Sequence, residues 1–345
     1  MTDQWYFPAE WSPQEAIWLT WPLNEQTWPG RLGRLQRKFA DIAATISRFE
    51  IVRINAAKSA HAEMRSLIAE AKGVMERIEL FDHPSNDVWC RDHGPIFVKN
   101  SVTGEVAATD WQFNAWGGKF PPWNLDNAIP ERIASELKLP RFTSNMILEG
   151  GAIEGNGNGL LITTEAVLLN ENRNRDWSKA QIEAELKRLL GVREVFWLKG
   201  GIEGDDTDGH VDDLTRFVRE DVVLTVVERD SRDPNYGILM ENRERLQELR
   251  TKSGSRVEII DLPMPEPLRV DEKDWRLDRL PATNANFLII NQAVLVPIFG
   301  QPKEDDQALG IIRECFPNRE VIGIHSADLV FEGGAIHCIS QQQPK

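Results

Sequence analysis

Hydrophobic and polar positions recur along the chain in one order, which predicts two short strands, an amphipathic helix and a third short strand. The clearest copy has apolar runs at 160–163 and 166–170, which we interpret as paired strands. Residues 178–191 then show helical spacing, with serine at the predicted N-cap and glycine at the C-cap. An apolar run at 194–198 supplies the last strand, so this segment predicts a ββαβ unit.

Other segments show the same order of elements. Three more copies are predicted at 215–220, 222–227, about 236–251 and 256–260; at 286–290, 293–299, 304–316 and 320–324; and, less regularly, at 94–100, 105–113, 126–138 and about 142–148. Asn291 and Gln292 are the expected turn residues of the second of these copies. A fifth unit would combine a strand near the C-terminus with the N-terminal strands and helices at 16–21, 31–48, 50–55, 60–72 and 77–81.

Repeated units of this kind cannot bury their apolar faces alone, so five of them around an axis predict a propeller-like α/β fold. No linker or low-complexity segment divides the chain, and we therefore expect one domain over residues 1–345. The alternative that the pattern leaves open is an ordinary mixed α/β sheet, because strands and helices alternate there as well.

Polar, glycine-rich segments fall at the same place in these units, after the last strand and before the next pair. They are residues 86–95, 149–159, 204–213 and 331–338. The sequence EGGAI occurs in two of them, beginning at Glu149 and at Glu332. Equivalent loops of a circular array meet at one axis, so we expect these distant segments to share one site.

Composition and charge narrow the class of partner. The chain has 345 residues, of which 41% are hydrophobic, and a formal net charge of −14, which disfavours nucleic acid and anionic membranes. This charge suits a cationic small molecule, although many acidic proteins bind none. Three cysteines do not make a disulfide framework, and neither a signal peptide nor a run of ~20 apolar residues is visible, so we expect a cytoplasmic protein.

The cysteines differ in their surroundings. Cys338 follows two glycines, which allow a ligand to approach the backbone closely, but a lone cysteine is more often a buried apolar residue. His337 would face the opposite side of a strand, so its position beside Cys338 does not make it the base. Cys315 lies on an apolar helix face, which indicates a structural role. Cys90 would be redox-sensitive only if it were exposed close to Cys338.

His210 is the candidate acid and base. It lies within a run of five aspartates that would favour its protonated form, and on a strand it would face the same way as Asp212. The same run could instead bind a divalent metal ion or form a solvated acidic turn.

Carboxylates and an indole complete the set of candidates. Asp92, near Trp89, is a natural partner for a guanidinium because a carboxylate matches its fork of N–H donors. Glu149 could orient a histidine, bind guanidinium or simply face water.

Six ordered stretches together resemble the agmatine deiminase and bacterial peptidylarginine deiminase branch of the guanidino-group-modifying, or pentein, superfamily. They are PAEWSPQEAIWLTWP (8–22), NDVWCRDHGPIFV (86–98), LEGGAIEGNGNGLLITTEAVLLNENRN (148–174), DDTDGHVD (205–212), NFLIINQAVLVPIFG (286–300) and GAIHCISQQQP (334–344). The resemblance implies a five-fold pseudosymmetric α/β propeller built from ββαβ units. It also implies the function of a hydrolase in polyamine (putrescine) biosynthesis.

The resemblance assigns roles to single residues. It implies Cys338 as nucleophile, His210 as general acid and base, Asp92 and Asp212 as the carboxylates that hold the guanidinium, and Glu149 as support for histidine and substrate. The family uses no metal, and we expect no cofactor. Departures from the family pattern occur at Glu332, Asp206, the segment 283–286 and the variable position Cys90, and these concern the substrate tail more than the chemistry.

The expected reaction converts agmatine to N-carbamoylputrescine and ammonia through a covalent thiouronium on Cys338. Trp89 and Asp206 are further candidates for substrate binding, with Asp206 or Asp208 accepting the tail ammonium. Alternative functions are deimination of free or peptidyl arginine, amidino transfer to an amine, or guanidine binding without catalysis. We expect the small cationic guanidine as partner, no nucleic acid or membrane, and allow for a homodimer.

Overall fold

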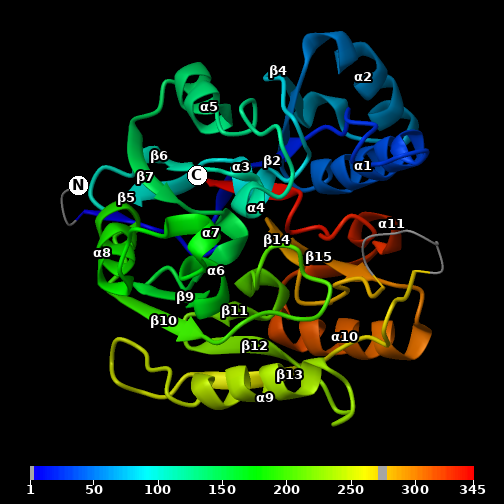
Figure 1. Cartoon of the computed structure of the whole chain (residues 1–345). Coiled ribbons are helices and arrows are strands. Elements are labelled where there is room, and N and C mark those ends of the chain that lie inside the picture. Colours follow the sequence, from blue (N-terminus) through cyan, green and yellow to red (C-terminus); the bar gives the residue numbers. More distant parts are fainter. Residues whose placement is uncertain (1–3, 271–277) are drawn as a thin grey trace.

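The computed structural model describes residues 4–270 and 278–345, whose strands form five sheets in a mixed α/β fold. In each sheet an antiparallel pair lies next to a strand that joins in parallel after a helical connection. The longer helices lie around the outside of the molecule and the sheets lie inside them (Figure 1). The recurring order of elements predicted from the sequence is therefore confirmed, with one exception described below.

The two ends of the chain share one sheet. Its order is β17-β2-β3-β4, with β2 (Gln14–Thr20), β3 (Ile51–Ala56) and β4 (Ile78–Asp82) parallel and β17 (Ser340–Pro344) antiparallel to β2. Helices α1 (Leu32–Ser47) and α2 (His61–Glu70) connect the parallel strands. This pairing holds the segment that carries Cys338 against the beginning of the chain.

Helix α1 forms because its apolar residues recur on one face. Leu35, Phe39, Ile42 and Ile46 are buried in the same apolar cluster as Ile17 of β2. Burial of each large side chain contributes about 1.5–3 kcal/mol, so this face accounts for the position of the helix.

The next sheet has the order β1-β5-β6-β7. Its strands are β1 (Trp5–Tyr6), β5 (Ile96–Asn100), β6 (Val106–Gln112) and β7 (Arg141–Ile147), and α5 (Ile129–Leu137) precedes β7. Helix α5 begins with proline in its first turn and ends at Lys138 in the left-handed conformation.

One predicted strand is wrong. Residues 166–170 do not pair with β9 (Leu160–Thr164); most of them belong to the short helix α6 (Glu165–Leu168). The Thr164 side chain accepts a hydrogen bond from the backbone N–H of Val167 and so caps a helical turn directly after the strand. The antiparallel partner of β9 is the two-residue strand β8 (Glu154–Gly155), while β10 (Glu194–Leu198) follows α8 (Lys179–Leu190) in parallel.

The remaining two sheets follow the prediction closely. They comprise β11 (Thr215–Arg219), β12 (Val222–Val227), α9 (Asn235–Leu246) and β13 (Glu258–Pro263), and then β14 (Leu288–Ile290), β15 (Ala293–Ile298), α10 (Pro302–Cys315) and β16 (Glu320–His325). The predicted turn between β14 and β15 is present, with Gln292 at a φ of +65°.

No helix among residues 4–270 and 278–345 is both long enough and apolar enough to cross a membrane.

Candidate active site

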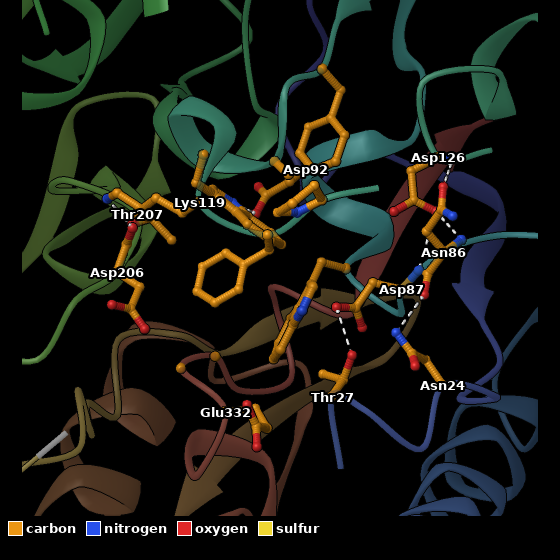
Figure 2. A pocket seen from close by; sticks show the side chains of 18 of the residues that line it. Asn24, Thr27, Asn86, Asp87, Asp92, Lys119, Asp126, Asp206, Thr207 and Glu332 are labelled. Atoms are coloured by element: carbon orange, nitrogen blue, oxygen red, sulfur yellow. Dashed lines mark hydrogen bonds between the residues drawn. The ribbon is translucent and has the colours of Figure 1, made fainter. Parts of the chain in front are cut away.

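Loops from four of the sheets meet at a cavity of about 390 Å³ (Figure 2). Its walls include Asp92 of α3 (Cys90–His93), Trp116 of α4 (Ala115–Gly118), Asp206, Gly334 and Cys338. Three of the four polar segments identified in the sequence therefore line one cavity, and the segment that begins at Glu149 packs next to it.

Cys338 lies in the turn between α11 (Ala327–Val330) and β17, and 4% of its surface is exposed. Asn286 Nδ2 lies 3.0 Å from Cys338 Sγ, and Asn286 Oδ1 accepts a hydrogen bond from the Cys338 backbone N–H at 3.3 Å. Asn286 was not identified as a site residue, because the segment 283–286 stands out in the sequence only as a departure from the family pattern, and the pattern predicts Asn286 at the start of a strand.

Glycine is required where these loops touch. A Cβ on Gly334 would lie 2.5 Å from the Trp89 ring and 2.9 Å from Cys338 Cβ. A Cβ on Gly151, in the segment after Glu149, would lie 2.6 Å from His210 Nδ1 and 2.9 Å from Asp92 Oδ1. All four distances are shorter than a Cβ atom tolerates, so the close packing of the site depends on these two glycines.

His210 is completely buried and precedes the 3-10 turn η4 (Val211–Asp213). The strand that we assumed for His210 and Asp212 is therefore wrong, but the tight turn still brings both side chains to one site. His210 Nδ1 lies 3.7 Å from Asp92 Oδ1, and neither ring nitrogen has a hydrogen-bond partner among the described residues. Burial alone would lower the pKa of His210, but the nearby carboxylates, Asp92 foremost, raise it above its ordinary value.

Asp92 is fixed through both carboxylate oxygens. Oδ2 accepts a hydrogen bond from Trp116 Nε1 and Oδ1 accepts one from the Gly151 backbone, each at 3.0 Å. Burial, together with the neighbouring charge of Asp212, raises the pKa of Asp92 to about 6. Trp116 was not identified from the sequence.

Asp212 differs from Asp92 in its partners. Its Oδ2 accepts a hydrogen bond from His337 Nδ1 at 2.6 Å and lies 3.8 Å from Cys338 Sγ. Burial would raise the pKa of Asp212, but the hydrogen bond from His337 and the cations nearby lower it. Its Oδ1 is buried without a hydrogen-bond partner among the described residues, so this oxygen can accept from a bound ligand.

Glu149 is completely buried and forms an ion pair with Arg173, whose Nε lies 2.6 Å from Oε1. Its Oε2 has no partner in the part of the chain that the structure describes. Glu149 raises the pKa of His210 through its charge, and no hydrogen bond joins the two side chains directly.

The two candidates for the tail ammonium are placed differently. Asp206 lines the cavity, where Figure 2 shows it and Glu332 on the opposite side from Asp87 and Asp126. Asp208 is paired with Lys119 and Arg173 at 2.7 Å each, outside the cavity lining. The structure therefore favours Asp206 over Asp208.

Aromatic side chains form the rest of the cavity wall. The rings of Trp89 and Trp116 meet edge to face with centroids 6.4 Å apart, and Phe120 packs edge to face on Trp116. Such walls exclude water and accept the methylene groups of a ligand.

The other two cysteines do not line the cavity. Cys90 is completely buried in a cluster with Trp18 and Phe97, and burial raises its pKa to about 12. A redox role for Cys90 therefore has no structural basis. Cys315 is buried on the inner face of α10, as predicted, and burial raises its pKa to about 11.

The surroundings of Cys338 are acidic. Burial and the carboxylates of Asp212, Asp213 and Asp92 raise the pKa of its thiol well above 9.0. Asp212, Asp213 and Cys338 each offer an atom within 4.8 Å of the others, so this group could also hold a metal ion. The arrangement thus suits a bound cation next to a sulfur nucleophile.

Comparisons with known proteins cover nearly the entire chain. The family model for Porphyromonas-type peptidyl-arginine deiminase matches residues 6–344. An agmatine deiminase of Medicago truncatula is 39% identical over 98% of this chain and 96% of its own length. The solved agmatine deiminase of Enterococcus faecalis superposes with a TM-score of 0.92 at 31% identity, over 99% of this chain and 96% of that one. A Cys-to-Ser variant of the C. Jejuni agmatine deiminase with substrate bound gives 0.88 at 32% identity, with the same coverage of the two chains. The chain therefore belongs to the Porphyromonas-type peptidyl-arginine deiminase family.

Proposed function

We propose that this protein hydrolyses agmatine to N-carbamoylputrescine and ammonia, with Cys338 as nucleophile. The observation that carries this proposal is that the Cys338 thiol and the Asp92 carboxylate line one aromatic-walled cavity, with Nδ1 of the buried His210 lying 3.7 Å from Asp92 Oδ1. The names of the full-length relatives support agmatine as the substrate.

Asp92 and Asp212 would hold the guanidinium group. Both carboxylates lie near enough to His210 to raise its pKa, and each can accept N–H groups of a planar cation. Asp212 Oδ1, which has no partner in the described structure, is the oxygen best placed to do so. This positioning aims the guanidinium carbon at Cys338 Sγ, and such orientation can lower the barrier by about 7–11 kcal/mol.

The chemistry requires a thiolate and a proton donor. The guanidinium charge offsets the carboxylates that raise the pKa of Cys338, so the thiol loses its proton to solvent once substrate is bound. The thiolate adds to the guanidinium carbon, and the protonated His210 gives its proton to the departing nitrogen, which leaves as ammonia. A thiouronium remains, in which the former guanidinium carbon is bonded to Cys338 Sγ.

Hydrolysis reverses the role of His210. Its neutral imidazole takes a proton from water, the resulting hydroxide adds to the thiouronium carbon, and the carbon–sulfur bond breaks. The hydroxyl proton of the adduct goes to solvent, the ureido product leaves, and the Cys338 thiolate and the protonated His210 are restored. Glu149 supports both steps through the charge that keeps His210 readily protonated.

The tail of the substrate decides between agmatine and arginine. Asp206 would accept the agmatine ammonium, and Trp89 would pack against its methylene groups. Free arginine would also require a cation for its carboxylate. Lys119 lines the cavity, but its ammonium is already bound to Asp208 at 2.7 Å and to the Asp206 carbonyl at 2.6 Å.

We also propose a five-fold pseudosymmetric propeller that acts as one catalytic domain over residues 1–345. The shared strand arrangement of five sheets and the pairing of both chain ends in one sheet support it. A cytoplasmic location is proposed because all three cysteines are unpaired.

The test is the release of ammonia and ureido product from agmatine, arginine and a blocked arginine peptide, each with and without chelator. We expect chelator-resistant turnover of agmatine and none by Cys338→Ser or His210→Ala. Near-normal turnover by Cys338→Ser would exclude this mechanism, and loss of activity with chelator would favour the metal alternative.

A further inference from the structure

His337, the residue before the nucleophile, is held between two carboxylates. Its Nδ1 lies 2.6 Å from Asp212 Oδ2 and its Nε2 lies 2.8 Å from Glu10 Oε2. Only 1% of its surface is exposed, and it does not line the cavity that contains Cys338 among the described residues. Asp212 does not line that cavity either, whereas His337 and Glu10 line a separate small pocket, so His337 contacts the proposed guanidinium ligand Asp212 from the side of Glu10.

Both carboxylates are ionised in this arrangement. Burial would raise the pKa of Glu10, but Arg216 and His337 hold it well below its ordinary range. The pKa of Asp212 is lowered as well. Because an ionised carboxylate can only accept, the geometry, with a carboxylate oxygen within 2.8 Å of each ring nitrogen, fits a His337 that donates from both nitrogens.

The far carboxylate is itself immobile. Glu10 Oε1 accepts a hydrogen bond from the Ile289 backbone at 2.7 Å, and Oε2 accepts one from Arg216 Nη2 at 2.7 Å. Arg216 is fixed in turn by Glu154 and by the Phe287 carbonyl. Glu10, which comes from the N-terminal segment, is thus a rigid anchor for Nε2 of His337.

The backbone of His337 belongs to the frame around the nucleophile. Its N–H donates to Asn286 Oδ1 at 3.0 Å, and Asn286 Nδ2 contacts Cys338 Sγ at the same distance. Its carbonyl accepts from Arg91 Nε at 3.3 Å. A substitution of the His337 side chain is therefore expected to alter the positions of Asp212 and Cys338.

We propose that His337 is a positioning residue that acts through Asp212. As an imidazolium anchored on Glu10, it keeps Asp212 ionised and turns the free oxygen of that carboxylate toward the substrate guanidinium. This inference rests on the proposed function, since it assigns Asp212 the task of binding the cation.

The pH dependence of cation binding follows from the charged groups around Asp212 and His337. Besides the Cys338 thiol, the charged groups near Asp212 are Asp92, Asp213, His210, Arg91, Arg216 and His337. Those near His337 are Glu10, Glu154, Asp212, Arg91 and Arg216. In the unaltered protein Asp92, with a pKa of about 6, limits cation binding at acid pH. Without the imidazolium the pKa of Asp212 rises. Protonation of Asp212 then weakens cation binding at acid pH in addition to protonation of Asp92.

The test compares two isosteric variants. His337→Asn places an amide N–H near the position of Nδ1 and keeps the bond to Asp212, whereas His337→Gln places one near Nε2 and keeps the bond to Glu10. Both lose the positive charge. We expect kcat/KM for agmatine to fall roughly 10- to 100-fold in His337→Gln, as for loss of a hydrogen bond to a charged group, and less in His337→Asn. The acid limb of the pH profile becomes steeper and moves to higher pH in both.

Controls separate this role from a structural one. His61→Gln changes a histidine of α2 remote from the cavity, and its profile should match the unaltered protein. Glu10→Gln removes the anchor charge while keeping its shape, and it should shift the acid limb in the same direction even if the His337 variants do not fold. Unchanged pH profiles in the folded variants, with only a lower Tm, would overturn the positioning role. Absence of agmatine turnover by the unaltered protein would instead overturn the proposed function.

Discussion

At the scale of single residues, the surroundings of Cys338 raise the pKa of its thiol, whereas a preformed thiolate requires surroundings that lower it. Three carboxylates lie near the sulfur, and burial adds to their effect, so the pKa of the thiol lies well above 9.0. The cation that enters the cavity supplies the charge that the free site lacks. The protein would therefore protect the proposed nucleophile from adventitious oxidation and alkylation until substrate binds.

This state of the thiol predicts slow alkylation. The rate of inactivation by iodoacetamide should keep rising with pH through 9.0, the ordinary thiol value, without a plateau at neutral pH. Peptide mapping should find the label on Cys338 alone, because Cys338 lines the cavity whereas the buried Cys90 and Cys315 do not. Cys315→Ser is the matched control, and a plateau below neutral pH would show that the thiolate is preformed.

Asp92 carries a second prediction. Its pKa of about 6 means that kcat/KM should fall as the pH drops through this value, because the protonated carboxyl no longer attracts a cation. Asp92→Asn keeps only one acceptor oxygen, so either the Trp116 indole N–H or the Gly151 backbone N–H loses its partner. We expect the variant to lose roughly 100-fold or more in kcat/KM and to remove this limb. Initial rates between pH 5 and 8 test this assignment. If kcat/KM of the variant still falls at acid pH, the fall is due to a group other than Asp92.

At the scale of elements, the periodic pattern identified every longer helix and most strands. It failed at 166–170, because an apolar run beside a strand looks the same whether it continues in a sheet or turns into a helix. The threonine cap at Thr164 was the deciding feature, and threonine is equally common in strands. Local turns such as η4 were also invisible, although they decide how His210 and Asp212 face each other.

Gly151 tests the importance of such local geometry. An alanine methyl here would press against His210, Asp92 and Asp212 at once. We expect Gly151→Ala to reduce kcat strongly while lowering the free energy of unfolding by only about 1–3 kcal/mol, as overpacking usually does. Gly310→Ala in α10, where nothing lies within 4 Å of an added Cβ, is the control, and equal activity of the two variants would argue against a tightly packed site.

At the scale of the whole molecule, the sequence predicted which loops would meet. It did not predict which residues from other parts of the chain would contact and support the side chains of those loops. Cys338, His210, Asp92 and Asp206 stand in polar segments with visible chemistry, whereas Glu10, Asn286 and Trp116 come from strand ends or from segments without a distinguishing pattern. Their roles depend on contacts across the chain, such as Glu10 with His337 over 327 positions. Such pairings depend on the sheet that the two ends of the chain share, and they cannot be read from local periodicity.

Burial across the molecule also affects stability. Asp126 is buried beside the cavity, and this raises its pKa from 3.8 to about 8, so the folded state holds a proton there that the unfolded chain has lost. Stability at this position therefore decreases as the pH rises from about 4 to about 8. Asp126→Asn keeps an acceptor for the Asn86 and Asp87 backbone and should become progressively more stable than the unaltered protein over this range. Urea unfolding at pH 5 and pH 8 checks it, and a difference independent of pH would contradict it.

The covalent intermediate tests the central claim most directly. Intact-mass analysis of protein quenched during turnover of agmatine should show a fraction heavier by one agmatine less one ammonia, and peptide mapping should place the added mass on Cys338. Cys338→Ser should show no adduct. Turnover of agmatine with no adduct at any quench time, or with the adduct on another residue, would contradict the assignment of Cys338 as the nucleophile.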